Sequence, residues 1–183
     1  MKKLLLPFLF FVAACNSKQP DKKTENTNYI ISMDGVAEIK LEMTQAEVEK
    51  VLGKKIPLAN PTDTVSGSWQ DSARISYKGL DLQLQFQRNY SSSDVFFMEL
   101  IGIKTSSPLC KTQSGITVGS DKLATITTYQ DSALQLLPDV YDSTNSKSLI
   151  TIHDYHDRRF ISFQIENKKV TALETGIRFH DSE

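Results

Sequence analysis

The sequence predicts an α+β fold in which a short helix followed by three antiparallel strands occurs twice, with both helices packed on one face of a shared sheet. Two observations lead to this prediction. A helix start recurs about 75 residues along the chain, and an apolar-polar alternation typical of half-buried strands follows each start. The two repeats are expected over residues 29–104 and 105–183.

The first helix is expected to begin after Thr44. The run Thr44-Gln45-Ala46-Glu47 has the pattern of a capping box, in which the Thr44 hydroxyl and the Glu47 carboxylate each accept a hydrogen bond from the other residue's backbone amide. Gly53 is a left-handed stop, so the helix is about two to three turns long. An alternating entry strand over 37–41 precedes it.

Three strands are expected after this helix. Residues 73–77 and 80–87 alternate between apolar and polar types and are joined by Lys78-Gly79, which predicts a hairpin with one face toward solvent. A loop over 89–94 leads to a third strand over 95–103.

The second half has the same expected order. Ser120 is the expected N-cap of its helix, with Leu123, Ile126 and Tyr129 on the apolar side. A turn is expected over 154–159, and the strands are expected over 149–152, 160–165 and 170–177. The closing phrases Ile101-Gly102-Ile103-Lys104 and Thr175-Gly176-Ile177-Arg178 also match, about 74 residues apart.

The stretch LEMTQAEVEKVLG over 41–53 resembles the opening of the SmpA/OmlA-type lipoprotein repeat. A tandem of a helix and three antiparallel strands is similar to the beta-lactamase inhibitor protein fold. The resemblance covers most of residues 37–178. Such proteins are binding modules in outer-membrane assembly factors and in enzyme inhibitors, so the resemblance implies that this chain binds another protein, and it assigns no functional residue.

The N-terminus has the pattern of a bacterial lipoprotein signal. Met1-Lys2-Lys3 is positively charged, and the apolar stretch over 4–11 is too short to span a membrane as a helix. Val12-Ala13-Ala14-Cys15 resembles a lipobox, in which Cys15 is acylated by chains such as palmitate and the chain is cut before it. The alternative is a secretory signal without a lipid.

Residues 1–14 are therefore expected to be a signal peptide, and residues 15–28 a lipid anchor with a flexible tether that has no apolar side chain after Cys15. Acyl chains at Cys15 would hold the protein to the membrane. Asn16 stands where an Asp retains some lipoproteins in the inner membrane, so the expected location is the periplasmic side of the cell outer membrane.

The composition excludes several classes of protein. The chain has 183 residues, with 21 Lys or Arg against 22 Asp or Glu, and a mean hydropathy of -0.30. These values are typical of a folded soluble domain and not of a polytopic membrane protein or a disordered chain. A nucleic-acid partner is not expected, because basic and acidic residues are interleaved.

No enzymatic activity, cofactor or metal is assigned from the sequence. His153, Asp154, His156 and Asp157 could ligate zinc, and the alternative is that they are solvated turn residues or, with Arg158 and Arg159, a charged patch for a protein. Cys110 has no partner for a disulfide once Cys15 is lipidated. It is expected to be a small buried residue, and the alternative is a reactive thiol.

A binding surface is expected on the sheet face opposite the helices. By parity this face carries nine side chains: Arg74, Ser76, Asp81, Gln83, Gln85, Gln87, Phe160, Ser162 and Gln164. Arg and aromatic side chains are enriched at protein interfaces. The expected partner-binding residues are Arg74, Gln83, Gln85, Phe160 and Gln164. The alternatives are a simply solvated face, or a site at the loop over 89–94.

Three functions follow from the sequence. The first is a lipid-anchored cell-envelope protein that binds an envelope protein in outer-membrane assembly or maintenance. The second is an inhibitor or immunity protein that blocks an enzyme through the open sheet face. The third is an enzyme or a carrier of a small ligand.

Overall fold

The computed structural model describes residues 29–58, 70–90 and 96–178. The signal peptide expected over 1–14, the lipidation site Cys15 and the tether to residue 28 lie outside these ranges. Most of the loop expected over 89–94 also lies outside them, although Asn89 and Tyr90 belong to a strand.

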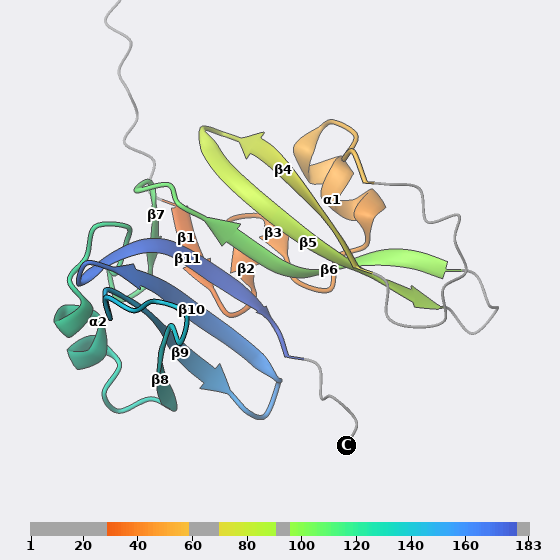
Figure 1. Cartoon of the computed structure of the whole chain (residues 1–183). Helices are drawn as coiled ribbons and strands as arrows, with labels where there is room; N and C mark the ends of the chain where they lie inside the picture. The colour runs from red at the N-terminus through yellow and green to blue at the C-terminus, as the bar shows by residue number, and fades with distance from the viewer. Residues whose placement is uncertain (1–28, 59–69, 91–95, 179–183) are drawn as a thin grey trace, which may run out of the picture.

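Two β-sheets build the described part of the chain (Figure 1). The larger sheet is antiparallel, and its strand order is β4-β5-β6-β11-β10-β9-β8. Its strands are β4 (Gln70–Tyr77), β5 (Leu80–Tyr90), β6 (Phe96–Thr105), β8 (Leu134–Pro138), β9 (Lys147–Asp154), β10 (Arg159–Glu166) and β11 (Lys169–Ile177).

The smaller sheet has the order β3-β2-β1-β7. Its strands are β1 (Tyr29–Ser32), β2 (Gly35–Val36), β3 (Ile39–Lys40) and β7 (Cys110–Thr112). The chain start and the middle of the chain meet here, because β1 pairs in parallel with β7.

The predicted fold class is wrong. The structure is mostly β-sheet: its described helices, α1 (Gln45–Leu52) and α2 (Lys122–Thr128), contain only eight and seven residues, and the strands form two sheets and not a tandem of helix-plus-three-strand repeats. The segments before each helix contribute strands to the smaller sheet, which the repeat prediction did not contain. The strand β8 adds a further departure, because it precedes the three strands expected in the second half.

The prediction of α1 is confirmed in detail. The Glu47 backbone amide donates to Thr44 Oγ1 at 3.3 Å, and the Thr44 amide donates to Glu47 Oε2 at 2.8 Å. Gly53 ends the helix with a φ of 66°, which is the left-handed region. The helix packs Val48 into the core, so the local sequence determines where it begins and ends.

The helix α2 begins differently from the prediction. Asp121, and not Ser120, is its N-cap, and the Asp121 side chain makes no capping hydrogen bond. The Ser120 hydroxyl accepts instead from the Thr117 amide at 3.0 Å. Tyr129 packs against the sheet with its ring 5.5 Å from that of Phe163, whereas Leu123 is 73% exposed. The helix therefore covers only part of the sheet beside it.

The core is one cluster on one face of the larger sheet, closed by the smaller sheet and by α1. Its largest fully buried side chains include Phe86, Leu82 and Leu84 from β5 and Phe163 from β10. The alternation predicted for these strands is confirmed, because in β5 the odd positions between these residues are less buried. The other face of the larger sheet lies outside this core cluster, and in β5 it carries polar side chains.

Candidate interaction surface

The open face of the larger sheet carries a continuous row of polar side chains. Direct cross-strand pairs connect its members from β4 to β9: Arg74, Gln83, Lys104, Glu174, Ser162 and Thr151. We call these six residues the polar row. Arg74, Gln83 and Ser162 were placed on this face by parity alone, whereas Lys104 and Glu174 were not predicted, because their strands meet only through tertiary pairing.

Exposure decreases along the polar row. Arg74 is exposed and Gln83 and Lys104 are half-buried, but Ser162 and Thr151 are buried. Ser162 was predicted to lie on this face by parity, but its side chain is buried there and not open to a partner or to solvent. The accessible part of the face lies over β4, β5 and β6, because the β9 and β10 side chains of the row are covered.

A hollow of about 680 Å³ lies beside the accessible part of the row. Its polar lining includes three of the five expected partner-binding residues, together with side chains from β4, β5 and β6: Arg74, Gln83 and Gln164, with Ser76, Asp81 and Lys104. Segments from both ends of the sheet therefore surround one depression.

The remaining two expected residues, Gln85 and Phe160, belong to the neighbouring row of the sheet. Gly102 and Gly176 stand between them, since Gln85 pairs with Gly102, Gly102 with Gly176 and Gly176 with Phe160. An added Cβ on Gly176 would lie 2.9 Å from Phe160 Cζ, so the aromatic ring covers this glycine. Phe160 is thus half-buried in the face and does not project freely from it.

Gln85 is engaged within the sheet. Its Nε2 donates to Gln70 Oε1 at 2.9 Å. It also lies close to Gly102, where an added Cβ would come within 3.2 Å of Gln85 Oε1. The Gln85 amide is therefore already bonded within the sheet.

Glu174 is the acidic member of the polar row. Burial raises the pKa of its carboxyl, and the positive charge of Lys104 on the neighbouring strand opposes part of that rise. The carboxylate therefore lies in a partly desolvated position before any partner covers it.

Basic and aromatic residues gather where β9 turns into β10. Tyr155, Arg158 and Arg178, which we call the basic rim, surround a small hollow of about 130 Å³ together with His153 and Arg159. The Tyr155 side chain is 72% exposed and stacks on His153, with 5.3 Å between ring centroids. Arg159 is not included in the basic rim, because its guanidinium forms ion pairs with Asp34 and with Glu42.

His153 contacts two members of the basic rim, Tyr155 and Arg178. Its Nε2 lies 3.2 Å from Gln135 Oε1 and 3.4 Å from Arg178 Nη2. Burial lowers the pKa of His153, and the Arg178 charge lowers it further, so the ring is neutral at pH 7. The guanidinium of Arg178 therefore lies beside an uncharged ring.

The zinc interpretation gains no support from the geometry. Among residues 29–58, 70–90 and 96–178, no group of three or more His, Cys, Asp and Glu side chains is placed to hold a metal. Asp154 Oδ1 accepts from the backbone amides of His156 at 2.9 Å and Asp157 at 3.3 Å, which is the arrangement of a turn. His153 is a buried residue of β9, and its ring contacts Gln135 and Arg178 and no acidic side chain in the described residues.

Cys110 is buried, as the first interpretation of it predicted. Burial raises the pKa of its thiol to about 11. Because the thiolate is the reactive form, this position is not that of a nucleophile or redox thiol at neutral pH.

Comparison with family models, with curated proteins and with solved structures found no match for this chain. No helix in the described residues is long and apolar enough to cross a membrane.

Proposed function

We propose that this chain is a lipid-anchored protein of the bacterial cell envelope that binds another protein through the open face of its seven-stranded sheet. The lipobox ending at Cys15 supports the anchor. The observation that carries the binding role is the polar row: a line of charged and amide side chains beside a hollow of about 680 Å³.

The chemistry of the row suits a protein surface. Arg74 offers a fork of N–H donors and Gln83 offers both a donor and an acceptor, so together they match carboxylates and backbone amides of a partner. Lys104 is half-buried, and the Glu174 carboxylate is already partly removed from water before a partner binds. Covering them with a partner therefore costs less than covering fully hydrated charges.

The basic rim extends the proposed contact surface. It adjoins the row of Gln85 and Phe160, because Phe160 pairs directly with His153. Exposed Tyr and Arg are the residue types that most often dominate the binding energy of an interface. We place the strongest contacts at Arg74 and at Tyr155, Arg158 and Arg178.

Co-purification from detergent-solubilised envelope tests this function. We expect a stoichiometric protein partner with the wild-type chain, and loss of about nine-tenths of it with Arg74→Ala plus Tyr155→Ala, because two strong contacts each contribute more than about 1 kcal/mol. Lys50→Ala plus Val140→Ala, at exposed positions of α1 and of the loop after β8, is the matched control.

The identity of the captured protein distinguishes the roles. An integral membrane protein favours assembly or maintenance, whereas one soluble enzyme favours inhibition or immunity. Unchanged capture by the Arg74→Ala plus Tyr155→Ala chain, with capture abolished by substitutions in 91–94, would move the site from the sheet face to the loop.

A further inference from the structure

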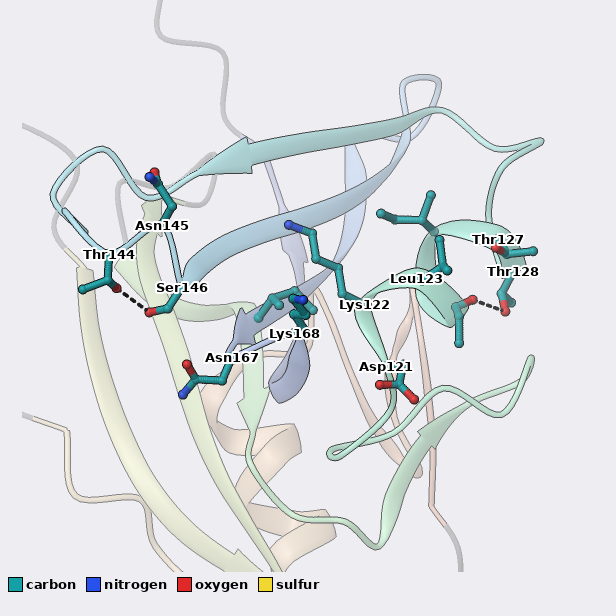
Figure 2. Close-up of a pocket in the computed structure, with 13 residues that line it drawn as sticks. Asp121, Lys122, Leu123, Thr127, Thr128, Thr144, Asn145, Ser146, Asn167 and Lys168 are labelled. Carbon is teal, nitrogen blue, oxygen red and sulfur yellow. Dashed lines mark hydrogen bonds between the residues drawn. The ribbon is translucent and has the colours of Figure 1, made fainter.

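A second hollow, apart from the open face, lies between α2 and the loop that joins β8 to β9 (Figure 2). Its volume is about 1260 Å³. The helix contributes Leu123, Ala124 and Ile126 to its lining, and β10 contributes Ile165. We call this hollow the α2 groove. Most of its exposed lining surface is apolar, although the loop side contributes Thr144, Asn145 and Ser146.

The groove has fixed walls. The turn between β10 and β11 joins them, because the Lys122 amide donates to Lys168 O at 2.8 Å on the helix side. On the loop side the Asn167 amide donates to Ser146 O at 3.0 Å. Asn167 and Lys168 both have positive φ, 50° and 64°, as a tight two-residue hairpin turn requires. The hollow is therefore part of the fold and not a gap between loosely held segments.

Apolar surface is left uncovered here. The Leu123 side chain is 73% exposed at the helix. Ile165 of β10 belongs to the buried core cluster and also lines the groove. A seven-residue helix is too short to cover this side, so the core face of the sheet continues into the groove.

The charges at the groove are positive. Figure 2 shows Lys122 and Lys168 between the helix and the loop. In the described part of the chain, neither ammonium has a carboxylate within ion-pair distance. The acid that lines the groove, Asp121, is paired with Lys169 at 2.9 Å. An apolar groove with two unneutralised lysines matches an amphiphile with an anionic headgroup.

Tyr29, the first described residue, lies at the same end of the molecule as the α2 groove. The Tyr29 amide donates to Leu109 O at 2.9 Å, and Tyr29 pairs with Cys110. Thr117 Oγ1 donates to Cys110 O at 2.6 Å, and Ser120, three residues on, accepts from Val170 next to the groove. The stretch from Cys15 to Tyr29 spans at most about 40 to 50 Å when extended, so a bilayer that holds Cys15 is within reach of the groove.

We propose that the α2 groove binds one anionic phospholipid of the membrane in which Cys15 is anchored. An acyl chain lies along Leu123, Ile126 and Ile165, and Lys122 and Lys168 contact the phosphate. The location rests on the proposed lipid anchor. The chemistry rests on the groove itself, since its volume accommodates one acyl chain of the lipid, with the second chain left outside, and lysines near an anionic membrane surface are attracted to it.

Native mass spectrometry of the purified mature chain in mild detergent tests this site. The protein is titrated with phosphatidylglycerol and, separately, with phosphatidylcholine of the same acyl chains. We expect one phosphatidylglycerol per chain, bound about tenfold more tightly than phosphatidylcholine. Lys122→Glu plus Lys168→Glu removes this preference, and Leu123→Asp weakens the binding of both lipids.

Two control variants carry the same chemical changes outside the groove. Lys50→Glu adds an acid to the exposed face of α1, and Tyr90→Asp changes an apolar side chain at the end of β5 that is 61% exposed. Both are expected to bind phosphatidylglycerol as the wild type does. All substituted side chains are at the surface, so folding is expected to be retained.

Any of three results overturns the lipid site: no lipid adduct on the wild-type chain, equal binding of the two lipids, or the same loss in the control variants as in the groove variants. The mass of the chain in the same spectra reports acylation of Cys15 independently. A chain that binds phosphatidylglycerol but carries no acyl group would contradict the proposed anchor and leave the groove's chemistry supported.

Discussion

Lys104 and Glu174 lie directly opposite each other where β6 pairs with β11, so an opposite-charge pair stands on the open face at the seam between the two halves of the large sheet. Four residue pairs make up that seam: Leu173 with Thr105, Glu174 with Lys104, Thr175 with Ile103, and Gly176 with Gly102. The carboxylate is partly desolvated and the lysine offsets part of the cost. At this seam the burial of the Glu174 carboxylate therefore lowers the free energy of unfolding.

The pH dependence of stability follows from Glu174. Its pKa is raised in the folded state by burial, so the folded chain binds this proton more tightly than the unfolded chain. The resulting destabilisation is absent below the ordinary Glu pKa and grows as pH rises through the folded pKa. Glu174→Gln should therefore stabilise the protein at pH 7, with the gain disappearing near pH 3.5, as measured by urea unfolding across pH.

Glu166→Gln is the control for this prediction, because Glu166 is exposed at the end of β10. It should change the free energy of unfolding little at either pH. A Glu174→Gln chain that is less stable than the wild type at pH 7 would show that the Lys104 attraction outweighs burial.

The core face of the sheet should be sensitive to truncation. Leu82 and Phe163 are almost fully buried, so Leu82→Ala and Phe163→Ala should each lower the free energy of unfolding by about 2 to 5 kcal/mol. Gln83→Ala, one residue along β5 on the open face, should cost far less. Equal losses for Gln83→Ala and Leu82→Ala in chemical denaturation would mean that the two faces are assigned the wrong way round.

The Cys110 thiol should be unreactive in the folded protein. Its pKa of about 11 leaves little thiolate at pH 8, and the side chain is buried. Labelling with a thiol reagent in a Cys15→Ser chain should be slow in buffer and fast in 6 M urea. Rapid labelling in buffer would restore the interpretation of Cys110 as an accessible, reactive thiol.

Lipid attachment should depend on Cys15. The wild-type chain is expected in the detergent phase after phase separation, and Cys15→Ala should move it to the aqueous phase because the acyl chains contribute most of the membrane affinity. Cys110→Ala is the control and should partition as the wild type does. A wild-type chain that stays in the aqueous phase would favour the secretory signal without a lipid.

Local rules predicted the parts of the fold that depend on neighbouring residues. The capping box of Thr44 and Glu47 involves residues three apart, and the alternation along Leu80–Tyr90 is visible in one strand, so both could be predicted. Tertiary pairing decided the rest. The strand β7 has three residues and pairs with β1, which lies far earlier in the chain, so no local pattern could predict that pairing.

The same distinction applies to the candidate site. Parity placed Arg74 and Gln83 on the open face, but their neighbours Lys104 and Glu174 depend on which strands meet, and sequence alternation does not contain that information. The strand β8 was missed because its alternation covers only Leu134, Gln135 and Leu136 before Leu137 and Pro138 interrupt it.

Site-specific photo-crosslinking in intact cells tests the central claim most directly. A benzophenone side chain at Gln83, in the middle of the accessible polar row, should crosslink one discrete partner, whereas the same side chain at Lys50 on α1 should not. The band from Gln83 should disappear when Arg74→Ala is added, since the two residues form a direct cross-strand pair. Crosslinking from Lys50 with none from Gln83 would contradict a binding role for the open face.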